Sequence, residues 1–93
     1  MTHISHELVR QNLLSQLDAA YPLALPIQTL QQGLSVAGLQ LTEEQLLKEL
    51  AYLLDKSFLT SLHSELCPCN MRYKISTKGI DFLDNESRNI SNF

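Results

Sequence analysis

The stretch that decides the fold is residues 58–76, which read FLTSLHSELCPCNMRYKIS. Its first part alternates between apolar and polar residues, so Phe58, Thr60 and Leu62 are expected on one face of a strand. Its last part alternates too, with Met71, Tyr73 and Ile75 on one face and Arg72, Lys74 and Ser76 on the other. Between them, His63–Asn70 contains a proline, which is typical of a loop. The stretch therefore predicts a two-stranded β-hairpin.

Residues 42–55, just upstream, predict the clearest helix of the chain. Thr42 followed three residues later by Gln45 is a capping box, and Glu43 and Glu44 suit the positive end of the helix dipole. The expected apolar face consists of Leu46, Leu47, Leu50, Ala51, Leu53 and Leu54. The expected polar face consists of Gln45, Lys48, Glu49, Tyr52 and Asp55. We expect this helix to be buried on one side and solvated on the other.

Two more helices are expected in the N-terminal half. The first is capped by Ser5 and runs to about Ala20, with Arg10 as an ordinary surface charge. Residues 23–25 should be extended, because Pro26 disfavours helical angles in its predecessor. Pro26 is expected to start the second helix, which ends near Leu34. Residues 35–41 form the turn to the third helix, and Gly38 marks the end of the second or the turn beyond it.

After the hairpin, Thr77 is expected to cap a short last helix with Ile80 and Leu83 pointing inward. Residues 85–93 are polar and expected to be frayed. The 93 residues are expected to form one domain, with its core between about residues 4 and 84. The predicted order is helix, short strand, helix, helix, hairpin, helix.

This order resembles the winged helix-turn-helix arrangement. Residues 46–59, LLKELAYLLDKSFL, resemble the third helix and first wing strand of small bacterial winged-helix regulators. Residues 73–83, YKISTKGIDFL, resemble their second wing strand and the following helix, which starts with T-x-G. The resemblance covers roughly residues 4–84. It implies an α+β fold with a three-helix core, a two- to three-stranded β-wing and a short C-terminal helix.

The resemblance also implies binding to double-stranded DNA, with the third helix in the major groove and the hairpin against the flanking backbone or minor groove. The implied contact residues are Thr42, Gln45, Lys48 and Tyr52 on the helix and Arg72, Lys74 and Lys78 on or beside the wing. Gln45 would contact adenine, Lys48 guanine or phosphate, and Tyr52 phosphate. The sequence departs from this pattern at Glu43, Glu44 and Glu49, because phosphates repel carboxylates.

The charge distribution leaves two functions open. The chain has a net charge of −3, which is unusual for a nucleic-acid-binding protein, yet residues 71–80 contain three basic residues and no acidic one. The first hypothesis is a transcriptional regulator that binds DNA as a homodimer, since two half-sites multiply a weak affinity. The first helix and the C-terminal segment with Ile90 and Phe93 are its expected dimer surfaces. The alternative is a winged-helix adaptor whose acidic third helix binds a protein partner.

No enzyme, cofactor or metal is expected. The three histidines have no evident nucleophile and orienting carboxylate beside them. His63, Cys67 and Cys69 invite a zinc hypothesis, but C-x-C is a poor chelate and a fourth ligand would have to come from His3 or His6. We favour two free thiols, with a redox switch in the wing as the alternative.

The sequence also predicts where the protein works. It has no apolar run of the roughly 20 residues that cross a bilayer, and residues 1–7 do not resemble a secretory signal. We expect a cytoplasmic protein that does not enter the membrane.

Overall fold

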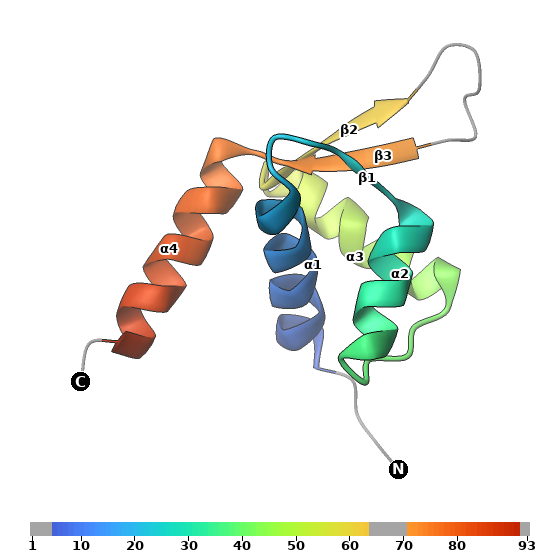
Figure 1. Cartoon of the computed structure of the whole chain (residues 1–93), viewed down its shortest axis with the longest axis horizontal. Coiled ribbons are helices and arrows are strands. Elements are labelled where there is room, and N and C mark those ends of the chain that lie inside the picture. The colour runs from blue at the N-terminus through green and yellow to red at the C-terminus, as the bar shows by residue number, and fades with distance from the viewer. Residues whose placement is uncertain (1–4, 64–70, 92–93) are drawn as a thin grey trace.

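The structure, a computed structural model, describes residues 5–63 and 71–91. Its elements, in chain order, are α1 (His6–Ala20), β1 (Leu25–Pro26), α2 (Ile27–Val36), α3 (Glu43–Asp55), β2 (Leu59–His63), β3 (Met71–Ile75) and α4 (Thr77–Ser91). Helices α1, α2 and α3 form a bundle, and the sheet covers one end of it (Figure 1). The predicted order of elements is confirmed, and the α+β fold with a three-helix core is the expected one.

The three strands form an antiparallel sheet in the order β1-β3-β2. Tyr73 and Ile75 of β3 share one face, as predicted, and both are buried in the core. The prediction for the first strand of the hairpin needs correction, because β2 begins at Leu59 and Phe58 lies outside it. Leu59 pairs with Ile75 and shares its inward face, so only 3% of Leu59 is exposed, whereas Thr60 and Leu62 are exposed.

The core is built from leucines on the facing sides of the three bundle helices, closed by residues of the sheet. Its buried members are Val9, Leu13, Leu14, Leu17, Leu30, Leu34, Leu46, Leu50, Leu53, Leu59, Tyr73 and Ile75. Helices α1 and α2 pack closely at Gly33, where an added Cβ would overlap the side-chain amide of Gln16. That amide donates to the Leu30 carbonyl at 3.1 Å, which ties α1 to α2.

The ends of the N-terminal helices follow the expected signals, with one correction. Ser5 caps α1, as predicted, by accepting a hydrogen bond from the Leu8 amide. Pro26 does not start α2 but precedes it in an extended conformation, with φ −78° and ψ 164°, because it pairs with Arg72 in the sheet. Helix α2 continues to Val36, and Gly38 then takes a φ of +83° that favours glycine.

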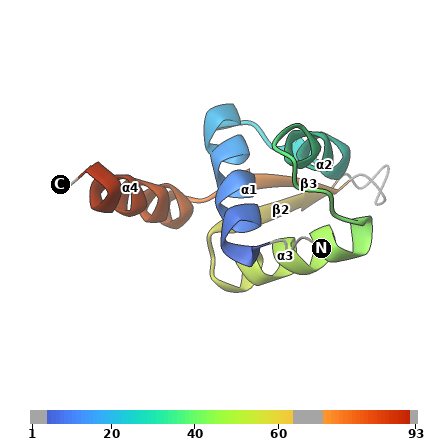
Figure 2. The same cartoon turned by 90° about the horizontal axis from the view of Figure 1, so that it is seen from below.

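The last helix differs most from its prediction. Its cap is Ser76 rather than Thr77, since the Ser76 hydroxyl accepts from the Gly79 amide at 3.1 Å and donates to the Ser57 carbonyl at 2.6 Å. Helix α4 is 15 residues long and includes residues 85–91, which were expected to fray. No glycine or proline follows Gly79, so nothing in the sequence stops the helix. It extends away from the bundle (Figure 2).

Candidate nucleic-acid interface

The predicted capping box at the start of α3 is confirmed. The Thr42 hydroxyl accepts from the Gln45 amide at 3.1 Å, and Gln45 Oε1 accepts from the Thr42 amide at 2.9 Å. Both residues are exposed, as a contact with DNA would require. However, Gln45 Oε1 is engaged in the cap, so a bidentate contact to adenine would require this hydrogen bond to break.

The outward face of α3 is rotated relative to its prediction. Lys48 is exposed and 38% of Tyr52 is exposed, as expected. Leu47 and Ala51 were expected to be buried, yet both are exposed, Leu47 by 41%. Leu46, Leu50 and Leu53 are buried, as expected, and Glu49 is buried with them, so that the buried positions recur at steps of three and four. The face that α3 presents to solvent therefore centres on Lys48 and Tyr52.

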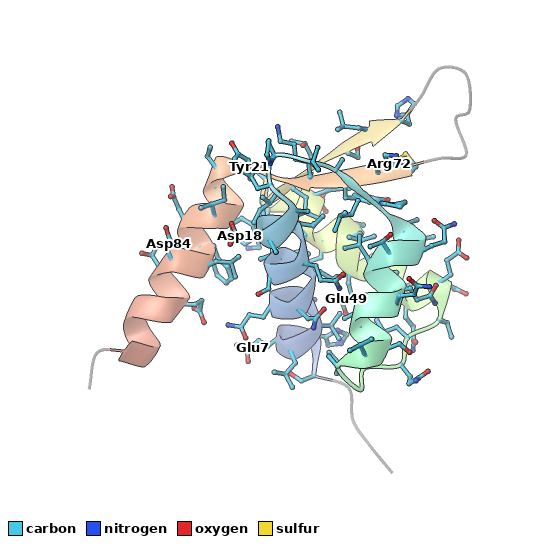
Figure 3. All side chains as sticks on the ribbon, in the orientation of Figure 1. Glu7, Asp18, Tyr21, Glu49, Arg72 and Asp84 are labelled. Carbon is cyan, nitrogen blue, oxygen red and sulfur yellow. The ribbon has the colours of Figure 1, made fainter. Side chains whose placement is uncertain are left out.

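Glu49 accounts for this rotation, and its predicted place on the polar face is wrong. Only 5% of the residue is exposed, and Figure 3 shows it among the helices of the bundle. Its Oε1 accepts a hydrogen bond from Arg10 Nε at 2.7 Å, and its Oε2 contacts His6 Nδ1. Burying a carboxylate is favourable only when charged or donating groups satisfy it, and α1 supplies both. Glu49 is thus withdrawn from the surface of α3.

Arg10 was expected to be an ordinary surface charge, but its side chain is partly buried and contacts two residues of α3. Besides binding Glu49, it places its guanidinium carbon 3.6 Å from the centroid of the Tyr52 ring. Lys56 lies on the same ring, with its Nζ 5.7 Å from the centroid. A signal was present in the sequence, because His6, Arg10, Leu13 and Leu17 are spaced by four, three and four residues on one side of α1. Two polar residues thus extend the stripe of core leucines.

The basic residues of the wing lie where the alternation predicted. Arg72 is exposed on the outer face of the sheet, opposite Pro26 on one side and Leu62 on the other (Figure 3). Lys74 lies on the same face, and its Nζ is 5.5 Å from the centroid of the Tyr21 ring. Tyr21 was not among the predicted site residues. Within the described residues, the three strands carry no aspartate or glutamate, so this face is basic.

Of the remaining predicted residues, the structure describes the side chain of only some. Lys78 is exposed in the first turn of α4. The segment with Cys67 and Cys69 lies outside the described residues, as do Phe93 and the side chain of Ile90. In residues 5–63 and 71–91 no group of three or more His, Cys, Asp or Glu side chains is arranged to hold a metal ion. None of the helices in these ranges combines the length and apolar character needed to cross a bilayer.

The start of α3 lies on the same side of the molecule as the end of β2 and the start of β3, opposite α4 (Figures 1 and 2). On the α4 side, a cavity of about 460 Å³ opens between α1, the end of α3 and α4. Its lining includes Leu8, Arg10, Tyr52, Lys56, Phe58 and Phe82. Arg10 and Tyr52 therefore form part of the wall of this cavity.

A three-helix bundle, a helix-turn-helix formed by α2 and α3, and an antiparallel sheet with a β-hairpin define the winged-helix fold. Among solved structures, the chain is similar to RosR of H. salinarum, in a structure grown from NaBr. The TM-score is 0.73 at 21% sequence identity, over 91% of this chain and 74% of that one. A likeness at this identity is one of fold. No family model matches the sequence, and no curated protein matches it.

Proposed function

We propose that this chain is a cytoplasmic transcriptional regulator that binds double-stranded DNA through α3 and the wing. The burial of Glu49 carries the proposal. In a winged-helix protein the third helix enters the major groove, and a carboxylate beside Lys48 would repel the phosphates there. With Glu49 bound to Arg10 and His6, the outward face of α3 offers Lys48 and Tyr52 instead.

Each proposed contact follows from the chemistry of the side chain. Lys48 reaches guanine or a phosphate, and the Tyr52 hydroxyl donates to a phosphate. Arg72, Lys74 and Lys78 bind the flanking backbone. Thr42 and Gln45 complete the set because both are exposed, and Gln45 offers its Nε2 amide, which the capping box does not use.

The protein is proposed to act as a homodimer. Glu43 and Glu44 remain exposed at the start of α3, so a single module with so few basic residues binds weakly. Two modules on adjacent half-sites multiply that affinity. Helices α1 and α4 are the proposed dimer surfaces, since Leu8 of α1 is 56% exposed and α4 extends away from the bundle.

A mobility-shift titration with random-sequence duplex DNA at low salt tests the proposal. The wild-type protein is expected to shift the duplex, and Arg72→Ala combined with Lys74→Ala should weaken binding by roughly tenfold or more, given the share of affinity that phosphate contacts supply. Arg72→Lys combined with Lys74→Arg is the control, because it keeps both positive charges on the wing and should bind like the wild type. Absence of any shift, with the wing variant behaving like the wild type, would contradict DNA binding.

A second candidate function is supported by Leu47. This leucine is 41% exposed on the outward face of α3, one helical turn from the exposed Glu43 and Glu44. An apolar side chain beside carboxylates suits a basic protein partner better than a phosphate backbone. The adaptor function would therefore depend on Leu47, whereas DNA binding depends on Arg72 and Lys74.

A further inference from the structure

Helix α1 contacts two residues of α3 through one side chain. We infer that Arg10 is a positioning residue for DNA recognition, which holds the Tyr52 ring in place and keeps the Glu49 carboxylate out of the groove. The inference rests on the proposed function, because it assigns Arg10 a role in presenting the surface of α3 to DNA. Helix α1 would then affect DNA binding through Arg10 and α3, without contacting DNA itself.

The geometry uses two different features of the guanidinium group. Its Nε donates to Glu49 Oε1 at 2.7 Å, in the plane of the group. Its face lies over Tyr52, with 3.6 Å between the guanidinium carbon and the ring centroid. A planar, delocalised cation can do both at once, whereas the compact ammonium of lysine cannot. The requirement at position 10 is therefore for arginine and not simply for positive charge.

Glu49, Arg10 and Tyr52 differ in how far they are buried. The Glu49 side chain is 7% exposed and the Arg10 side chain 29% exposed, so the ion pair lies largely inside the protein. Tyr52 is 38% exposed, and its ring centroid lies 3.6 Å from the guanidinium carbon of Arg10 and 5.7 Å from Lys56 Nζ. Arg10 is thus the partly buried support of an exposed residue that is proposed to contact DNA.

Loss of Arg10 would act on DNA binding in two ways. Tyr52 would lose the cation that fixes its ring. Its side chain would then have to become ordered on binding, which costs binding free energy. Glu49 would keep only its contact with His6, and a buried carboxylate with one partner fewer favours an exposed conformation, here beside Lys48. That conformation adds a negative charge to the surface that faces the phosphates.

A mutant cycle measured by fluorescence anisotropy on labelled duplex at fixed salt tests the inference. Arg10→Gln is expected to weaken binding roughly threefold to tenfold, the range that a partly buried cation–π contact supports. Arg10→Lys keeps the charge but loses the stacking, so its loss should be smaller. Adding Arg10→Gln to a Tyr52→Ala, Glu49→Gln background should change the affinity by less than about twofold, because both residues through which Arg10 acts are gone.

Stability is measured alongside by thermal unfolding, so that a loss of fold is not mistaken for a loss of positioning. Gln16→Ala is the structural control, since it removes a bond between α1 and α2 and touches no proposed DNA contact. It should lower Tm and leave the affinity unchanged. The affinity of every variant is measured well below its Tm.

The outcomes separate the inference from the proposed function. Wild-type affinity in Arg10→Gln would overturn the inference and leave DNA binding intact. A loss that persists undiminished in the Tyr52→Ala, Glu49→Gln background would also overturn it, because Arg10 would then contact DNA directly. If the wild-type protein does not bind duplex DNA, the proposed function fails and the inference fails with it.

Discussion

Glu49 differs from the other carboxylates of α3 because its charge is satisfied by side chains of α1. The period of α3 predicts Glu49 on the polar face, since a helical pattern assigns charged residues to solvent. Its partner Arg10 is 39 residues away in the chain, and no local pattern connects the two. Whether a carboxylate is buried depends on such a partner, so the burial of Glu49 could not be predicted from the period of α3, although the spacing of His6 and Arg10 indicates that both lie on the core side of α1.

The Arg10–Glu49 pair gives a prediction for stability. Arg10→Ala should lower the free energy of unfolding by about 1–3 kcal/mol, because it leaves a buried carboxylate with one donor fewer. Replacing both partners, as Arg10→Met with Glu49→Leu, should recover most of the loss, since no charge then remains buried. Urea unfolding of both variants is the measurement. A double variant that is no more stable than Arg10→Ala would show that the stranded charge is not the cause.

Tyr73 predicts how stability changes at alkaline pH. Burial raises the pKa of its hydroxyl above the ordinary value of 10.0, so the folded state disfavours the phenolate. The contribution of the protonated Tyr73 hydroxyl to the free energy of unfolding is therefore fully present below pH 10. It is lost as the pH rises from 10.0 through the folded-state pKa. Unfolding measured across this range should show a steeper loss of stability in the wild type than in Tyr73→Phe. Parallel curves for the two proteins would contradict the assignment.

At the scale of elements, α4 illustrates why the T-x-G pattern contains a glycine. A Cβ at Gly79 would overlap the backbone carbonyl of Phe58 and lie 2.8 Å from Ile75 Cγ1. Helix α4 can therefore lie against the start of the hairpin only if position 79 has no side chain. Its full length was not predicted, because the polar composition after Asp84 suggested fraying while no residue in that part stops a helix.

Two glycine substitutions test this packing. Gly79→Ala should lower the free energy of unfolding by about 1–3 kcal/mol, since the clash is with backbone that cannot move freely. Gly33→Ala should change it by less than about 1 kcal/mol, because the Gln16 amide that it meets is the end of a flexible side chain and alanine favours helix. Thermal unfolding of both variants provides the comparison. Equal costs would contradict the close approach of α4 to Phe58.

The sheet shows which features can be predicted from the alternation of apolar and polar residues alone. Alternation placed Tyr73 and Ile75 on one face of β3 and Arg72 and Lys74 on the other, and the structure shows that the first of these faces meets the core. It did not distinguish Leu59 from Phe58 as the inward residue of β2. Both are apolar, and the choice is made by the pairing of Leu59 with Ile75.

At the scale of the whole molecule, the order of elements was predicted from the sequence because each element has its own period and end signals. The charge of the surface was not predicted correctly, since it depends on tertiary contacts such as that between Glu49 and Arg10. The proposed dimer leads to a prediction at this scale. Sedimentation equilibrium at micromolar concentration should give twice the monomer mass of 10.5 kDa, and Leu8→Asp should return the protein to monomer. A wild-type monomer at these concentrations would contradict the dimer.

The dependence of DNA affinity on salt tests the central claim most directly. Each phosphate contact contributes a slope of about −0.9 to the plot of log K against log salt concentration. If Arg72 and Lys74 bind phosphates, the slope should be steep in the wild type and shallower by about 2 in the double alanine variant. Affinity that does not change with salt, or equal slopes in the two proteins, would contradict DNA binding through the wing.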